Sequence, residues 1–371
     1  MKITRVEVLY LKLPEIDASR CDGTQDTLVV RVHTDEGITG IGEIDSSPMV
    51  AKAVIEAEAS HSIAIGLEDL LIGEDPFDIE RLWQRMYQGT LYFGRSGPAI
   101  HAISGIDIAL WDIIGKATGR STAQMLGGAY RNRIQVYASL VMPGTIREAA
   151  ALAEKYMGLG YKAIKFGWGP LGKDEKFDLE AVKTLRSVVG DDIKLMFDIG
   201  QTWDAQQAIR MAKRFEEYGV YWIEEPLPPH DYAGYAQLAD AVDVYIAAGE
   251  QESGRLAYER LLNEARLDIL QPDIGRCGGL SEGKKIAYMA FDHNKKVVPH
   301  AFKTGILVAA SAHFVASMPH GYLLEYTVSE SPLARKLVKN PLRFEDGYVY
   351  LPEGPGLGIE LDEDVVNHYR C

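Results

Sequence analysis

Ionisable side chains stand at the ends of successive apolar runs in the second part of the sequence. Neighbouring members of this set are 23 to 33 residues apart, about the length of one strand, one helix and their loops. In a barrel of parallel strands the carboxyl ends share one mouth, so the spacing predicts that these side chains meet. The set comprises Lys165, Asp198, Glu224, Glu250, Asp273, His300 and Glu325.

Three neighbouring members of the set are carboxylates and could hold a metal ion. Asp198, Glu224 and Glu250 would repel one another in a pocket of low dielectric unless a cation lay between them. Oxygen ligands with no cysteine nearby favour Mg2+ over Zn2+, with Mn2+ as an alternative. Each carboxylate alone could instead cap the following helix. Three at near-equal spacing are hard to explain as caps, so the sequence predicts a Mg2+ site.

A histidine and an aspartate follow the three carboxylates. His300 closes the run KVVPH, where a lone histidine is more often structural than catalytic. Asp273 ends the preceding run, and a carboxylate on a neighbouring strand can accept from one ring nitrogen and raise the basicity of the other. The pair therefore predicts a histidine base.

Other polar residues have more than one interpretation. Arg95 could reach a distal group of a substrate or be a solvated loop residue, and Lys303 could contact substrate, donate a proton or, as we favour, lie on the surface. Strand alternation predicts that Glu225 points away from the mouth and orients its neighbours. The polar segment 15–26 could be a lid or an ordinary exposed loop. We expect structural roles for His101, His230 and His320.

A regular alternation of elements would position these residues. From about residue 133, eight β-branched runs alternate with helical stretches at a repeat of roughly 25 residues, which predicts an α/β fold with a (β/α)8 barrel, a modified TIM barrel, over residues 128–339. Residues 1–127 read as an antiparallel meander followed by helices, an α+β capping domain. Residues 340–371 have hairpin character around Asp346-Gly347, and we expect this tail to return to the cap.

The composition narrows the class of protein. The 371 residues are 47% apolar and 25% charged, and the net charge of -14 argues against nucleic-acid and anionic-membrane partners. The cysteines, three in number and far apart, indicate reduced thiols and a cytoplasmic protein. The first residues lack the apolar stretch of a signal peptide, and we expect no membrane span.

These motifs resemble the enolase superfamily, and specifically its mandelate racemase subgroup, over nearly the whole chain. The metal-ligand positions of the third, fourth and fifth barrel strands match FDIG, WIEEP and AAGE, and an Asp-His dyad of the family matches QPD and VPH. A glutamate that hydrogen-bonds the substrate carboxylate matches YLLEY, and the helix leading into the barrel matches AISGIDIALWDIIGK. The resemblance implies Mg2+-dependent removal of the proton α to a carboxylate, giving an enediolate. In that mechanism His300 is the base and Lys165 contacts the substrate carboxylate.

One departure from the subgroup indicates the type of reaction. The family often ends the second barrel strand with Lys-x-Lys, whose second lysine is a base on the other face of the α-carbon, whereas this chain has Lys165-Phe166-Gly167. A single base suits the dehydration of a sugar acid, an aldonate or aldarate, to a 2-keto-3-deoxy acid. The alternatives are a racemase, epimerase or cycloisomerase of a carboxylate, and a non-catalytic ligand-binding relative. The resemblance also implies a homo-oligomer.

Two neighbouring positions bear on substrate contact. Gly167 could leave room for a longer substrate, and Trp168 could form a wall beside it, although core filling is the commoner role of a tryptophan. Gly200 stands where the subgroup usually has asparagine, two residues after Asp198, and Gln201 is a candidate substitute.

Overall fold

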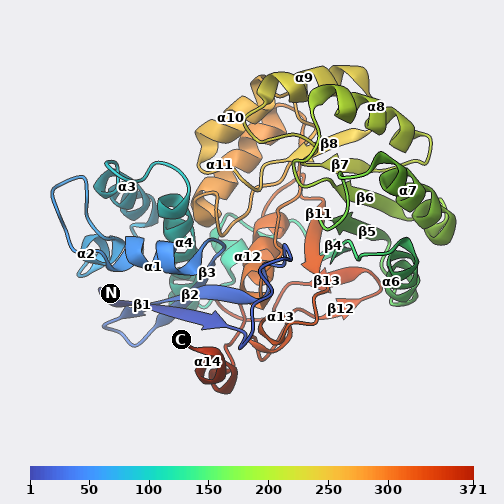
Figure 1. The fold of residues 1–371 in the computed structure, drawn as a ribbon. Helices are drawn as coiled ribbons and strands as arrows, with labels where there is room; N and C mark the ends of the chain where they lie inside the picture. The colour runs from blue at the N-terminus through green and yellow to red at the C-terminus, as the bar shows by residue number, and fades with distance from the viewer.

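Two sheets organise the chain, and Figure 1 shows the cap and the barrel built around them side by side. The computed structural model describes residues 1–371. The cap sheet is antiparallel with strand order β1-β2-β3, which confirms the predicted meander. Its strands are β1 (Ile3–Lys12), β2 (Asp26–Thr34) and β3 (Thr39–Ile44). The helices that follow are α1 (Pro48–Glu56), α2 (Leu67–Leu71), α3 (Ile79–Gly89), α4 (Pro98–Thr118) and α5 (Thr122–Met125).

Helix α4 lies directly on strand β3 because two glycines of the strand allow a close approach. A Cβ added at Gly40 would lie 2.0 Å from the carbonyl oxygen of Ala109, and one added at Gly42 would lie 1.9 Å from that of Gly105. No side chain fits at either position, so the helix backbone packs on the strand backbone.

Helix α4 is also long and apolar enough to cross a membrane by length and composition alone. In its most apolar window, however, 83% of the residues are buried inside the protein, against β3 and the barrel helix α11 (Gly279–Asp292). Burial within the fold therefore accounts for the apolar character of α4.

Eight parallel strands form the predicted barrel. Backbone pairing runs in the order β10-β9-β8-β7-β6-β5-β4, and β11 pairs with β4 from the other side. The strands are β4 (Arg133–Val141), β5 (Ala163–Gly167), β6 (Lys194–Asp198), β7 (Trp222–Glu224), β8 (Tyr245–Ala248), β9 (Ile269–Leu270), β10 (Lys296–Val297) and β11 (Leu323–Thr327).

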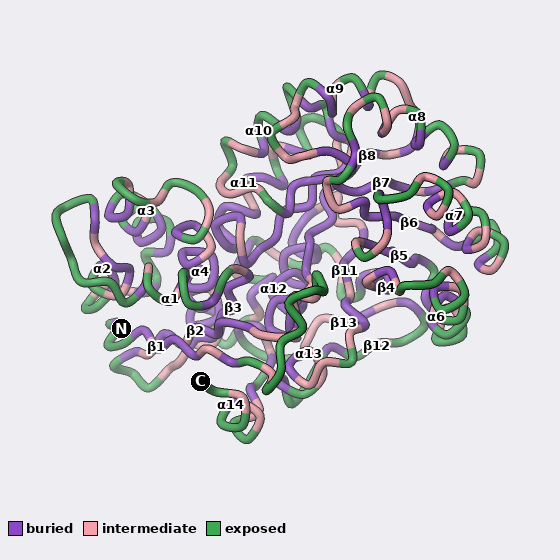
Figure 2. The backbone as a smooth tube through the Cα atoms, viewed as in Figure 1, coloured by how far each residue is buried: buried purple, intermediate pink, exposed green.

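Helices cover the outside of the barrel, and Figure 2 shows exposed helix faces around a buried interior. The segment after β11 holds only the short α13 (Pro332–Lys336), so the eighth helix is reduced to 5 residues. Helix α12 differs from the others because Ile306–Ala316 are buried throughout, against β3 as well as β11. The other helices between the strands are α6 (Ile146–Gly158), α7 (Glu175–Val189), α8 (Ala205–Glu216), α9 (Tyr232–Ala241) and α10 (Arg255–Asn263), together with α11.

The tail contacts both parts of the molecule. Its hairpin, β12 (Phe344–Glu345) and β13 (Tyr348–Tyr350), extends the barrel sheet by antiparallel pairing of β13 with the start of β4. Farther along, α14 (Glu363–Tyr369) packs near β1, and the Cys371 amide donates to the Tyr10 carbonyl at 2.9 Å. The limits of the three segments, 1–127, 128–339 and 340–371, remain a prediction.

Candidate active site

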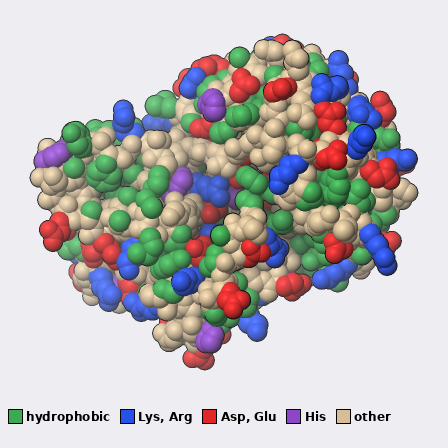
Figure 3. All heavy atoms as spheres, in the orientation of Figure 1, with side chains coloured by type: hydrophobic (Ala, Val, Ile, Leu, Met, Phe, Trp, Pro, Cys, Tyr) green, Lys and Arg blue, Asp and Glu red, His purple; other side chains and the backbone are tan.

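The structure brings the predicted ionisable residues together where the carboxyl ends of the barrel strands face the cap. Figure 3 shows acidic, basic and histidine side chains gathered in a hollow between the two parts. A cavity of about 100 Å³ lies there. Glu224 and Asp273 are fully buried and are not among the residues that line it. The members that line it are Lys165, Asp198, Glu250, His300 and Glu325.

The three carboxylates form a compact buried cluster. One oxygen each of Asp198, Glu224 and Glu250 lies within 4.8 Å of the others, and all three side chains are buried. Burial, together with repulsion within the cluster, raises the pKa values of Asp198 and Glu224 above their usual range. A divalent cation between these oxygens would remove the cause of the repulsion, so the donor set fits a hard ion such as Mg2+.

Lys165 lies beside this cluster at the end of β5. Its ammonium donates to Glu224 and lies 3.0 Å from Oε1 of Glu325. Burial alone would lower the pKa of Lys165, but the two carboxylates outweigh burial and hold that pKa well above its usual value. The lysine is therefore a fixed positive charge inside the site, within reach of anything bound in the cavity.

Glu325 on β11 is a hydrogen-bond acceptor in this structure. It accepts from Ser139 Oγ and from the Ala301 amide, each at 2.6 Å. Burial would raise its pKa, but Lys165 and His300 outweigh burial and lower the pKa of Glu325 to about 2. In this structure Glu325 contacts Lys165, Ser139 and the loop that carries His300.

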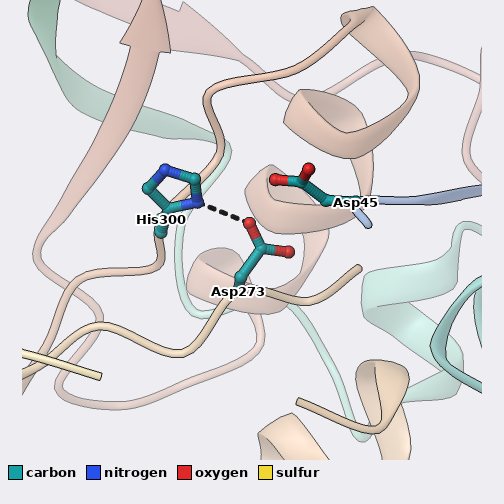
Figure 4. Close-up of side chains that lie close together, drawn as sticks. All are labelled: Asp45, Asp273 and His300. Carbon is teal, nitrogen blue, oxygen red and sulfur yellow. Dashed lines mark hydrogen bonds and ion pairs between the residues drawn. The ribbon is translucent and has the colours of Figure 1, made fainter. Parts of the chain in front are cut away.

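His300 and Asp273 form the expected dyad, drawn in Figure 4. Nδ1 of His300 bonds to Oδ2 of Asp273 at 2.5 Å, while Nε2 lies 3.4 Å from Glu250 and 3.8 Å from Glu325. Burial would lower the pKa of His300, but Glu250, Glu325 and Asp273 outweigh burial and raise it to about 10. Burial also raises the pKa of Asp273 to about 6. The bond at Nδ1 leaves Nε2 as the ring nitrogen that faces the cavity.

Gly167 pairs in register with Asp198 across neighbouring strands. A Cβ at Gly167 would lie 2.8 Å from the Asp198 Cβ and 3.0 Å from its Oδ2, so the glycine accommodates the carboxylate itself. Trp168 is half-buried and lines the cavity, so the core-filling interpretation is wrong. Gly200 has a φ of +62°, and a Cβ there would lie 3.0 Å from the Trp168 ring, so a side chain at this position would crowd that ring. Gln201 turns away from the cavity and donates to Glu225 at 2.6 Å.

Several weaker candidates lie outside the cavity. Arg95 is exposed, and His230 lies at the surface. His101 is half-buried beside Ser46, at 2.9 Å from its hydroxyl. His320 is half-buried, and burial lowers its pKa. Glu225 is buried, and burial raises its pKa to about 8.

The expectation that Lys303 lies on the surface is wrong. Its side chain is 3% exposed, and its ammonium donates to the carbonyl oxygens of Gly23 at 2.7 Å and Asp26 at 3.0 Å. Both acceptors belong to the predicted lid segment 15–26, and Cys21 and Gly23 of that segment line the cavity. The segment therefore lies at the mouth of the barrel.

Two charged residues of the site were missed in the sequence. Arg276 lines the cavity and donates to Asp45 Oδ2 at 2.8 Å and to the Glu250 carbonyl at 3.2 Å. Asp45 follows β3 in the cap and lies with Asp273 and His300 in a second cluster, whose ligand atoms are within 4.8 Å of one another. A charged residue three positions beyond a strand-end aspartate was a usable signal for Arg276. Nothing in the periodicity places Asp45 at the barrel mouth.

Known proteins of similar sequence have related activities. The chain is 32% identical to the D-galactarolactone cycloisomerase of Agrobacterium fabrum, with 100% of this chain and 99% of that protein aligned. It is 31% identical to the arabinonate dehydratase of Saccharolobus solfataricus over 93% of this chain and 91% of the relative. Among solved structures, the 3,6-anhydro-D-galactonate cycloisomerase of Zobellia galactanivorans has a TM-score of 0.91 and 31% identity, with 100% of both chains covered.

Two family models match most of the chain. Residues 2–127 match the mandelate racemase / muconate lactonizing enzyme N-terminal domain, and residues 148–365 match the enolase C-terminal domain-like family. The matched regions correspond to the cap and the barrel described above, and enzymes of this superfamily typically use Mg2+. The chain belongs to the mandelate racemase and muconate lactonizing enzyme group of the enolase superfamily.

Proposed function

We propose that this enzyme is a Mg2+-dependent dehydratase of a sugar acid, an aldonate or aldarate. It removes the proton α to the carboxylate and expels the hydroxyl group on the β-carbon, giving a 2-keto-3-deoxy acid. The observation that carries this proposal is a single histidine base, held by Asp273 at one ring nitrogen and facing the cavity with the other.

The metal ion would be held by Asp198, Glu224 and Glu250, whose clustered oxygens are the ligands that Mg2+ prefers. When bound, Mg2+ supplies positive charge to a substrate carboxylate, whose α-proton is otherwise very weakly acidic.

Lys165 supplies a second, permanent positive charge. Its ammonium is fixed between Glu224 and Glu325, so it needs no reorganisation as negative charge grows on the substrate carboxylate. Glu325 acts by holding Lys165 and the loop of His300 in place. Its own oxygens are occupied by Ser139 and the Ala301 amide.

His300 takes the α-proton at Nε2 in its neutral form. The Glu250 carboxylate is the largest cause of the raised pKa of His300, and a cation held by Glu250 would offset that charge and lower this pKa. The bond of His300 to Asp273 fixes the ring orientation and stabilises the imidazolium that forms. The protonated ring can then return that proton to the departing hydroxyl, so that water leaves. The enol product gains a solvent proton at the β-carbon when it becomes the 2-keto acid.

The absence of a second base supports elimination over racemisation. A racemase needs a base on each face of the α-carbon, and the residue at the expected second position is Gly167. The space beside Gly167 is taken by the Asp198 side chain. Elimination requires only one abstraction, which the His300 dyad provides.

A ring-opening cycloisomerisation is the second candidate, favoured by the names of two relatives, the cycloisomerases of Agrobacterium fabrum and Zobellia galactanivorans. The same base would remove the α-proton of a cyclic sugar acid, and the leaving β-oxygen would stay attached to the product through the former ring. The two reactions therefore share every residue named above and differ in the substrate.

The proposal is tested by incubating the Mg2+-loaded enzyme with open-chain C4 to C6 sugar acids and, separately, with their lactones and anhydro forms. Semicarbazide detects a 2-keto product, and mass spectrometry distinguishes a product one water lighter from one of unchanged mass. In D2O, one deuterium should enter the β-carbon. A loss of water from an open-chain acid supports the dehydratase, and an unchanged mass supports the cycloisomerase.

His300→Asn is the matched control, because it removes the base and leaves the metal cluster intact. It should form no product while still binding Mg2+ in a calorimeter. If no acid in either panel reacts, and α-deuterated substrates keep their deuterium, the protein is a ligand-binding relative and the proposal is wrong.

A further inference from the structure

The loop between β1 and β2, residues 13–25, lies across the barrel mouth, and we call it the cap loop. Its middle, from residue 14 to residue 21, is exposed. Cys21 and Gly23 nevertheless line the cavity. The barrel must therefore hold the cap loop in place through the few residues near its second end.

Thr24 and Lys303 make the contacts at this end of the loop. Thr24 Oγ1 lies 2.7 Å from Ser329 Oγ, and Ser331 Oγ donates to the Thr24 carbonyl at 2.6 Å.

The buried Lys303 ammonium donates to the Gly23 and Asp26 carbonyls, which use two of its three hydrogens. Asp26 Oδ1 and Asp45 Oδ1 each lie 3.6 Å from the same nitrogen. A buried ammonium with two backbone acceptors and two nearby carboxylates is well compensated, so this geometry is stable without substrate.

Asp45 connects this contact to the reacting groups. One of its oxygens faces Lys303, and the other accepts from Arg276 at 2.8 Å. Arg276 in turn donates to the Glu250 backbone. Figure 4 shows the Asp45 carboxylate beside Asp273 and His300, although it belongs to the cap.

The residue after Lys303 docks on the cap as well. Thr304 Oγ1 donates to Glu43 Oε2 at 2.8 Å, and the Leu307 amide donates to the same oxygen at 2.9 Å. Glu43 lies in β3, the strand that Asp45 follows. The segment from His300 to Leu307 thus carries the base at one end and its attachment to the cap at the other.

We propose that Lys303 is a positioning residue that keeps the cap loop closed over the active site, with Asp45 as the counter-charge that holds its ammonium at the joint between cap and barrel. Closure of the loop and placement of the segment 300–307 are then linked, because Lys303 lies in that segment and its ammonium binds the loop. The effect on turnover rests on the proposed function, whereas the closure itself does not.

Trypsin cleavage after Arg20 provides a direct measure of closure, because Arg20 lies in the exposed middle of the cap loop. A protease cuts a folded chain where the chain opens locally, so the rate of this cut follows the fraction of molecules whose loop has left the barrel. Lys303→Met should increase the rate at which mass spectrometry detects the 1–20 fragment on the order of tenfold. Asp45→Asn should give a smaller increase, and Lys303→Arg should restore a slow rate.

Lys285→Met is the matched control. Lys285 also joins barrel to cap, through Glu80 at 2.7 Å, but it lies on α11 away from the cavity. Its loss should leave the rate of cleavage after Arg20 within about twofold of the parent. If Lys303→Met does not accumulate as folded protein, Lys303→Gln carries the same comparison, because it loses the charge and the reach to two carbonyls.

An unchanged rate of cleavage after Arg20 in a folded Lys303 variant would overturn the proposal, as would an equal increase in Lys285→Met. With an active substrate, Lys303→Met should raise KM more than it lowers kcat, since the loop covers bound substrate. If the parent turns over no sugar acid but Lys303→Met is still cleaved faster after Arg20, the positioning role stands and only the proposed function fails.

Discussion

Two layers of the barrel interior differ completely in chemistry although they are only a few residues apart. The lower layer takes one fully buried residue from each strand or the position beside it, and it is apolar apart from the phenol of Tyr137 and the indole N–H of Trp222. The upper layer is polar or ionisable in every strand. The lower residues are Tyr137, Ala163, Met196, Trp222, Ala247, Ile269, Val298 and Leu323. Those above them are Ser139, Lys165, Asp198, Glu224, Glu250, Asp273, His300 and Glu325.

In six of the eight strands the two layers are separated by two residues, so both point inward by strand alternation. The lower layer is stable through packing alone. The upper layer is stable only because its buried charges are compensated by neighbouring groups, and some of these groups belong to the lower layer. Trp222 Nε1 donates to Glu224 at 3.0 Å, and the Tyr137 ring centroid lies 5.5 Å from the Lys165 ammonium. The lower layer therefore supports the charged side chains above it, both by packing beneath them and by contacting Glu224 and Lys165 directly.

The largest effect should come from removing a carboxylate of the upper layer. Asp198→Asn should weaken Mg2+ binding by about 100-fold or more and abolish turnover, because one anionic ligand of the cluster is lost. Unfolding of the metal-free variant should be no easier than in the parent, because burial already disfavours the Asp198 charge. Calorimetric Mg2+ titration and urea unfolding measure the two effects.

Asp191→Asn, at an exposed position shortly before β6, is the control and should bind Mg2+ as the parent does. Tight Mg2+ binding by Asp198→Asn would show that the ion lies elsewhere. The upper layer could then no longer be described as the metal site of the barrel.

A cavity made in the lower layer should lower stability and leave Mg2+ binding nearly unchanged, the opposite of the effect of Asp198→Asn. Leu323 is fully buried, two residues before Glu325. Leu323→Ala should lower the free energy of unfolding by about 3 kcal/mol, through lost burial and the cavity left behind. The folded variant should keep Mg2+ affinity within a few-fold of the parent. A variant of normal stability that binds Mg2+ poorly would contradict the division of roles.

A buried carboxylate of the cap, Glu43, sharpens the comparison, because the nearby Lys303 ammonium lowers its pKa less than burial raises it. Burial raises the pKa of Glu43 from 4.5 to about 7. The folded protein therefore binds this proton more tightly than the unfolded chain does, and the stabilisation is present below pH 4.5 and lost as pH rises through 7.

Glu43→Gln cannot titrate, so its stability relative to the parent should improve by about 2 kcal/mol between pH 5 and pH 8. Urea unfolding of both proteins at the two pH values measures the change. A difference that is the same at pH 5 and pH 8 would mean that Glu43 is already ionised in the folded protein.

The upper layer was predictable because each member ends its own apolar run. Strand alternation and the repeat of one strand and one helix require no knowledge of the rest of the molecule, and they located His300 and Asp198 alike. Gly167 was recognised as unusual for the same reason. The dyad followed from the order of neighbouring strands in a barrel.

The charges that join cap to barrel were not predictable in this way. Asp45 reaches Arg276 across 231 positions of sequence, and Lys303 reaches Gly23 across 280. Local patterns contain no information about which cap loop docks on which barrel loop. Lys303 was therefore assigned to the surface, although its ammonium is buried by a partner from the other end of the chain.

The smallest expected effect separates two explanations of Gly167. If the glycine leaves space for substrate, Gly167→Ala should change substrate affinity and leave Mg2+ binding alone. The structure instead places a new Cβ 2.8 Å from the Asp198 Cβ, so the Asp198 carboxylate must shift by a few tenths of an ångström. Mg2+ affinity should then fall about threefold to tenfold, with less than about 1 kcal/mol lost in stability.

Gly158→Ala, where an added Cβ meets nothing within 4 Å, is the control. Equal Mg2+ affinities in the two variants would show that Asp198 tolerates a side chain at its neighbour, and the glycine would then have to be explained by the substrate.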